Sequence, residues 1–260
     1  MRAVATADRF VGRRREIRRE QGARRLRIVV ALTAVSLLAV ITIGTLNSEL
    51  ADVDSVSVVG NSRTSTEEIT VATGIRLGHP MLDLDLPTAQ RQVTRLPWIA
   101  AVDIDRRLSG DVVVHVRERE PVAALPTDRG FVLIDETGYQ LEPVSNLPEG
   151  FVPVEGLVAS GRPGEYAPQQ TTLVLNVLGG ITPAIRPEVD RLVVEDDGLV
   201  IELTHGGRAV FGDSSQLGEK IQSLATVLAR VDLKCVSIID LRVPSAAAVR
   251  RSESAEGACI

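Results

Sequence analysis

Apolar and polar residues follow two different periods along the chain, and each period predicts one kind of element. In residues 53–61 valines alternate with serines, which indicates a half-buried strand that ends at a turn. Ser65 and Glu68 have the spacing of a capping box, and Gly74 supplies a left-handed stop, so a helix is expected between them. The expected order of this part is a strand (53–59), a helix (65–74), a second helix (86–96) and a β-hairpin (102–117).

The second part of the chain has the pattern of a sheet accompanied by two helices. A hairpin is expected over residues 131–141, and residues 146–168 are rich in Pro and Gly, as in a loop. The later elements are a helix (169–178), three short strands (191–195, 199–204 and 208–211), an amphipathic helix (217–231) capped by Ser214 or Ser215, and a last strand (235–243). Residues 245–260 have neither period and are rich in Ala, Ser and Arg, so a disordered tail is predicted.

One uninterrupted apolar run, Ile28–Leu46, precedes these elements and contains no charged residue or proline. At ~1.5 Å per residue, a helix of this length covers roughly 28 Å, close to the thickness of the hydrocarbon core of a bilayer. A cleaved signal peptide is the alternative. The run exceeds the usual apolar region of a signal peptide, and no A-x-A-like cleavage site follows it, which favours an uncleaved transmembrane helix.

Charge is distributed unevenly around this run. The net charge of −5 divides into +7 over residues 1–27 and −12 over the remainder. Positively charged residues that flank a membrane span remain on its cytoplasmic side. Residues 1–27 are therefore predicted to be a cytoplasmic tail, and the chain after the span is predicted to be extracytoplasmic. Contact of the arginines with anionic membrane lipid accounts for this tail without invoking nucleic acid, and an aromatic content of 3% argues against base stacking.

The sequence shows no constellation of residues that would make an enzyme. His79, His115 and His205 lie in a loop, a strand and a turn, and neither they nor the cysteines have the spacing of metal ligands. No nucleophile, base and orienting group can be placed together, so no catalytic residue, metal site, cofactor or small-molecule substrate is predicted. Cys235 and Cys259 could form a disulfide in an exported region or remain free thiols.

Two segments imitate catalytic motifs. Residues 207–214 resemble a phosphate-binding loop, but Asp213 stands where the loop requires a lysine, so a turn is expected instead. The acidic pairs Asp135–Glu136 and Asp196–Asp197 are expected in turns, as solvated carboxylates without the shifted pKa that acid–base catalysis needs.

The order of elements is more specific than any single motif. A strand, two helices and a hairpin, with the segments VDSVSVVGNSRTSTEEI, GHPMLDLD, RLPWIAAVDIDRRLSG and VREREPVA, resemble a POTRA domain of the FtsQ/DivIB type. The resemblance covers most of the chain. It implies an α+β protein with a basic cytoplasmic tail (1–27), a transmembrane helix (28–46), a POTRA domain (51–120), a family-specific β domain (121–244) and a tail (245–260).

This resemblance also implies a function. Members of the family are non-enzymatic, single-pass proteins of the cytoplasmic membrane that act as divisome scaffolds at the division septum. The implied partners are FtsB and FtsL and, through them, FtsW and its transpeptidase partner, so that septal peptidoglycan synthesis is influenced. The alternative is a POTRA-bearing chaperone for polypeptide transport, but the chain shows neither POTRA repeats nor the strands of a barrel.

The last expected strand is the candidate partner site. A terminal strand is often the edge of a sheet, and an edge can accept a strand from a partner. Apolar side chains occur on both faces of Cys235–Val243, so a strand buried on both faces is an equally good interpretation from the residues alone. The resemblance favours the edge. The candidate contact residues are Val236, Ile238, Ile239, Leu241 and Val243.

Overall fold

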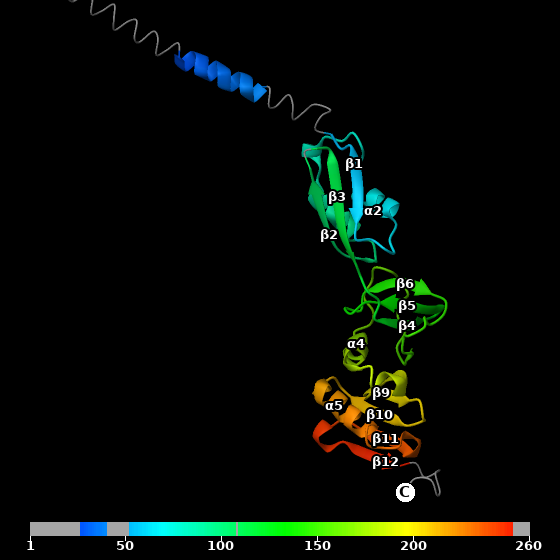
Figure 1. Ribbon diagram of the computed structural model, residues 1–260. Helices are drawn as coiled ribbons and strands as arrows, with labels where there is room; N and C mark the ends of the chain where they lie inside the picture. The colour runs from blue at the N-terminus through cyan, green and yellow to red at the C-terminus, as the bar shows by residue number, and fades with distance from the viewer. Residues whose placement is uncertain (1–26, 41–51, 108, 252–260) are drawn as a thin grey trace, which may run out of the picture.

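The computed structural model describes residues 27–40, 52–107 and 109–251, and these form a short helix followed by two domains (Figure 1). Residues 27–40 are helical, and every side chain in this helix is exposed. Within the described ranges, no helix is both long enough and apolar enough to cross a membrane. The tail expected before residue 27 and the end of the expected span, residues 41–46, lie outside these ranges.

The first domain, residues 52–120, is a three-stranded sheet covered by two helices. Its strands are β1 (Ser55–Val59), β2 (Ile99–Arg106) and β3 (Asp111–Glu118), arranged in the order β1-β3-β2 with β1 parallel to β3. The helices are α2 (Thr66–Thr73) and α3 (Leu86–Val93), and the 3₁₀ helix η2 (Met81–Asp83) lies between them. The predicted order of strand, two helices and hairpin is therefore confirmed.

The helix boundaries of this domain follow from local hydrogen bonds. The Ser65 hydroxyl accepts the amide of Glu68, and Gly74 ends α2 in the left-handed region with a φ of 69°. Asp85 caps α3 in the same way through the amide of Thr88. Apolar residues of both helices, including Ile69 and Val93, pack against the valines of β3 in one buried cluster.

The second domain begins at Val122 and contains two sheets. The smaller sheet consists of β4 (Ala123–Thr127), β5 (Gly130–Ile134) and β6 (Gln140–Val144) in sequential order. The larger sheet has the order β12-β11-β10-β9-β8-β7. Its strands are β7 (Val154–Glu155), β8 (Val189–Glu195), β9 (Gly198–Leu203), β10 (Arg208–Gly212), β11 (Val236–Asp240) and β12 (Ala248–Arg251).

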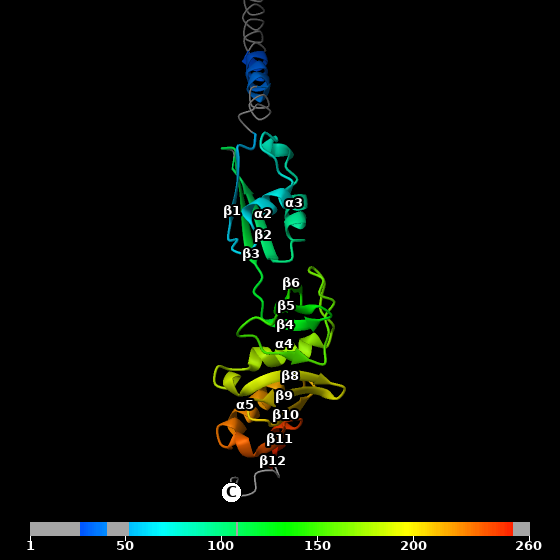
Figure 2. The same cartoon turned by 90° about the vertical axis from the view of Figure 1, so that its right-hand side faces the viewer.

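Two helices pack with these sheets. Figure 2 shows α4 (Thr171–Gly180) between the smaller sheet and β8, and α5 (Leu217–Leu228) connects β10 to the last strands, as Figure 1 also shows. One continuous cluster of buried apolar residues joins the smaller sheet, both helices and the larger sheet. The mixed α+β fold expected from the sequence is thus confirmed.

The chain departs from the expected elements at its C-terminal end. Residues 244–246 form the 3₁₀ helix η5 and Ala248–Arg251 form β12, where the start of a disordered tail was predicted. That prediction was wrong for these residues because β12 is held by main-chain pairing with β11, which requires no apolar side-chain pattern. Neither Ser214 nor Ser215 caps α5, since its N-cap residue is Gln216.

Candidate partner-binding edge

Among the described residues, the large sheet ends at β7 on one side and at β12, not β11, on the other. β11 pairs in parallel with β10 on one side and antiparallel with β12 on the other, so it is an interior strand. All four side chains of β12 are exposed, and no strand within the described residues pairs with its outer edge. The unpaired edge expected at residues 235–243 therefore lies one strand further along the chain.

A β-bulge at Ser237 sets how β11 presents its side chains. Val236 is opposite Arg251 and Ile238 is opposite Arg250, so Ser237 is the extra residue on β11. The Ser237 hydroxyl donates to the carbonyl oxygens of Arg250 and Arg251 at 3.1 and 3.3 Å. This bulge interrupts the alternation of faces, so Val236 and Ile239 are both buried although strict alternation separates them.

The five candidate contact residues fall into two groups. Val236, Ile239 and Leu241 are buried in the core of the second domain, as the alternative interpretation of a buried strand implied. Ile238 is half-buried, and Val243, which follows β11, is 58% exposed. Only these last two side chains have surface that a partner could contact.

The residues that form the edge itself were not predicted from the sequence. Val249 is 39% exposed on β12, and Arg250 and Arg251 follow it with exposed side chains. The signal for this strand is weak because Ala248–Arg251 contains a single large apolar residue. The last element expected from the sequence ends at Val243, whereas Pro244 begins the 3₁₀ helix η5 that returns the chain to β11.

A groove lies between α5 and η5, next to the residue that leads into β12. It has a volume of about 480 Å³ and is lined by Glu219, Gln222, Ser223, Thr226, Val227, Pro244, Ser245 and Ala247. The Ser223 hydroxyl donates to the carbonyl oxygen of Pro244 at 3.0 Å, which fixes η5 against the helix. The groove therefore has defined walls and adjoins the segment that leads into β12.

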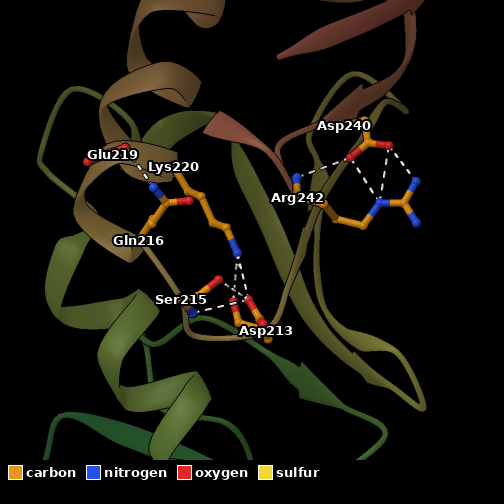
Figure 3. Close-up of polar contacts among 7 residues, drawn as sticks. All are labelled: Asp213, Ser215, Gln216, Glu219, Lys220, Asp240 and Arg242. Atoms are coloured by element: carbon orange, nitrogen blue, oxygen red, sulfur yellow. Dashed lines mark hydrogen bonds and ion pairs between the residues drawn. The ribbon is translucent and has the colours of Figure 1, made fainter. Parts of the chain in front are cut away.

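An ion pair fixes the start of α5 (Figure 3). The Nζ atom of Lys220 lies 3.0 Å from both the main-chain oxygen and Oδ1 of Asp213. Hydrogen bonds from Ser215 and Lys220 lower the pKa of Asp213 to about 2. Asp213 thus lies in a turn, as was expected in place of a phosphate-binding loop. Its carboxylate accepts hydrogen bonds from the Ser215 amide and from the Lys220 ammonium.

A second polar turn follows β11. Asp240 accepts a hydrogen bond from the main-chain amide of Arg242 and three from its guanidinium, the shortest being 2.6 Å between Nη2 and Oδ2 (Figure 3). These hydrogen bonds with Arg242 lower the pKa of Asp240. The turn directs the chain from β11 toward Val243 and η5.

The remaining candidate residues lie apart from this edge and from one another. His115 is 3.5 Å from Asp105 on the first sheet, and His205 is 3.9 Å from Glu188 near β9. Across the described ranges, no group of three His, Cys, Asp or Glu residues could hold a metal ion. Cys235 is disulfide-bonded, and Cys259, the second cysteine of the sequence, lies outside those ranges.

Asp135 differs from the solvated turn residue that the sequence suggested. Its side chain is buried, and Arg119 reaches it from the end of the first domain. Burial raises the pKa of Asp135, but hydrogen bonds from Thr137, Arg119 and the Tyr139 amide outweigh it, so the pKa is lowered. The expectation of a solvated carboxylate with an ordinary pKa was wrong because the neighbouring domain covers this turn.

Comparison with known proteins yields a match for each domain. The POTRA domain of the FtsQ type matches residues 51–119, and the C-terminal domain of cell division protein FtsQ/DivIB matches residues 123–242. Cell division protein FtsQ of Streptomyces collinus is 29% identical over 242 residues, which are 88% of this chain and 90% of the relative. Its counterpart from Corynebacterium glutamicum is 24% identical over 204 residues, which are 78% of this chain and 90% of the relative.

Proposed function

Because the chain belongs to the FtsQ/DivIB family of cell division proteins, we propose that it is a non-enzymatic scaffold of the divisome. In this role it binds other division proteins at the septum and performs no chemistry itself. The observation that carries the proposal is the outer edge of β12, with which no strand among the described residues pairs and whose side chains are exposed, so a partner strand could pair with it.

The partners are FtsB and FtsL, with FtsB adding a strand to β12. Main-chain hydrogen bonds along the edge supply affinity, and side chains on alternate positions supply selectivity. Val243 and Val249 provide apolar contacts beside that edge, and the groove between α5 and η5 accepts the part of the partner that follows the strand. Through these partners the protein influences FtsW and its transpeptidase partner, and so septal peptidoglycan synthesis.

The five residues of the original candidate site take two roles in this proposal. Ile238 and Val243 contact the partner, since part of each side chain is accessible. The other three residues support the site without touching the partner. They are buried in the core and so hold β11 in the position in which it pairs with β12; they are Val236, Ile239 and Leu241. A lysine at Ile239 or Leu241 would disrupt the core, so these positions do not test binding cleanly.

The scaffold is fixed in the cytoplasmic membrane by a single helix over residues 28–46, with its N-terminus in the cytoplasm. The uncharged run of nineteen residues and the excess of arginine before it support this topology. Both folded domains then lie outside the cytoplasm, and β12 belongs to the domain further from the anchor along the chain.

Co-purification of the full-length protein with FtsB tests the proposal. Lysine substitutions at Val243 and Val249 should reduce the recovered FtsB strongly, while the matched change Val158→Lys, at an exposed valine remote in sequence from the edge, should leave it unchanged. An N-terminal fluorescent fusion should form a band at the division site. Undiminished FtsB recovery in both edge variants would rule out the β12 site, and a uniform envelope signal would contradict the divisome role.

A further inference from the structure

The entry point of the first domain is joined firmly to one loop. Val53 donates its amide to the carbonyl oxygen of His79, and its own carbonyl oxygen accepts the amide of Gly78, both at 2.9 Å. Asp52 and Pro80 form an adjoining antiparallel bridge. The first described residues after the apolar run are therefore held against the loop that runs from Arg76 to Asp83.

Two leucines of this loop are exposed without an apparent structural reason. Leu77 is 67% exposed and Leu82 is 46% exposed, although Met81 beside Leu82 is buried in the core. The Arg106 guanidinium donates to the Met81 carbonyl oxygen at 3.1 Å and fixes this backbone. The loop lies at the end of the first domain where the chain enters (Figure 2), so both leucines belong to that end.

Chain length limits how far this end can be from a membrane. Six peptide units separate Leu46, the last residue of the apolar run, from Asp52. Fully extended, they span at most about 22 Å, and the polar layer of a bilayer is itself roughly 5–7 Å thick on each side. A loop bound to residues 52–53 is thus always close to the surface of the bilayer in which the run is embedded.

From this placement we infer that the loop Arg76–Asp83 rests on the outer surface of the lipid bilayer, with Leu77 and Leu82 inserted among the headgroups. The inference rests on the proposed membrane anchor. Apolar side chains gain by leaving water, and a fixed loop loses little conformational entropy when it docks. Contact at this loop, together with the anchor, would orient the first domain relative to the membrane.

The charges around the loop indicate which lipid it accepts. Arg76, Arg106 and Arg107 are accompanied by Asp52, Asp54 and Asp83 within the same end of the domain. A basic patch that would select anionic lipid is therefore missing among the described residues of this end. The contact is apolar, and zwitterionic phosphatidylcholine is sufficient for it.

Quenching by brominated lipid tests the contact in the full-length protein. The chain is reconstituted into phosphatidylcholine nanodiscs with or without bromine on the acyl chains, and tryptophan is introduced as Leu77→Trp, Leu82→Trp or, as the control, Val158→Trp. Val158 is an equally exposed apolar residue of the second domain. The native Trp98 contributes the same background to every variant.

We expect the added emission of both loop variants to shift to the blue and to be quenched in brominated discs, with no such change for Val158→Trp. If the protein co-elutes with the discs and the loop variants behave like the control, the loop contact is overturned while the anchor stands. If the protein does not co-elute with the discs, the proposed anchor fails and the loop contact fails with it.

Discussion

Nη1 of Arg119 lies 2.6 Å from Oδ2 of Asp135, and this pair joins the end of the first domain to a hairpin turn of the second. The same guanidinium stacks 4.2 Å from the ring centroid of Tyr139. Trp98, which precedes β2, packs with apolar residues of the smaller sheet and extends the contact. The junction is therefore a packed interface, and this fixes the direction in which the second domain carries β12.

The first prediction concerns this ion pair. Arg119→Met should lower the free energy of unfolding by about 2 kcal/mol, because it leaves the buried Asp135 carboxylate without its charged partner. Denaturant titration followed by Trp98 fluorescence measures the change, since the only tryptophan of the chain lies at the junction. The pKa of Asp135 should also rise toward its ordinary value.

A matched control is available in the second domain. Arg162 and Glu165 form an exposed pair at 3.5 Å, and Arg162→Met should change the stability by less than ~0.5 kcal/mol. Equal effects of the two substitutions would mean that the Arg119 pair contributes no more than a surface contact, and the packed junction would need another explanation.

The second prediction is a loss of stability in acid that depends on Glu118. Burial raises the pKa of this carboxylate, but hydrogen bonds from the amides of Thr64 and Arg63 and from Ser62 lower it to about 2, from an ordinary value of 4.5. A carboxylate whose pKa is lower in the folded state stabilises that state at pH values above its pKa in the unfolded state. This stabilisation is lost as the pH falls to the pKa of the folded state. Stability should therefore fall as the pH drops from 4.5 toward 2.

Thermal unfolding across this pH window measures the effect. Glu118→Gln should flatten the decline and cost on the order of 2 kcal/mol at neutral pH, because charge-assisted hydrogen bonds to the loop before α2 are lost. The exposed Glu120, two residues further on, provides the control Glu120→Gln. An unchanged acid profile in Glu118→Gln would contradict the assignment.

The third prediction is an asymmetry between the two members of the Lys220–Asp213 pair. Lys220 has no exposed side-chain surface, whereas the side chain of Asp213 is 76% exposed. Lys220→Met removes a buried charge and leaves Asp213 in water, so stability should stay within about 1 kcal/mol of the parent. Asp213→Ala leaves the buried ammonium with one main-chain acceptor and should be clearly more destabilising. Chemical denaturation of both variants decides, and the reverse order would contradict the prediction.

Features determined by neighbouring residues could be predicted from the sequence. The Ser65 and Gly74 signals bound α2 correctly because a helix end is satisfied by hydrogen bonds within a few residues. The alternating valines of β3 likewise placed a buried face toward the helices. These features, with the order of the elements, were sufficient to identify the fold of the first domain.

Features determined by distant contacts could not be predicted. Asp135 is buried because Arg119 of another domain covers it, and nothing in the turn sequence indicates this. β12 exists because β11 offers it main-chain partners, so its own residues carry little signal. Strict alternation assigns Val236 and Ile239 to opposite faces of β11. The bulge at Ser237 displaces the faces by one position, so both residues are buried in the same core.

The last prediction links the Ser237 bulge to the proposed edge. Ser237→Ala removes the hydroxyl that donates to the Arg250 and Arg251 carbonyl oxygens, a loss of about 1 kcal/mol that acts locally on β12. Amide hydrogen exchange of the β12 residues should therefore accelerate several-fold, while β9 exchanges as before, and FtsB recovery should fall. Ser145→Ala, an exposed serine that directly follows β6 and does not line the groove, is the control. If exchange of the β12 amides became faster while FtsB recovery stayed unchanged, FtsB binding would not depend on the stability of β12. That result would argue against strand addition to β12.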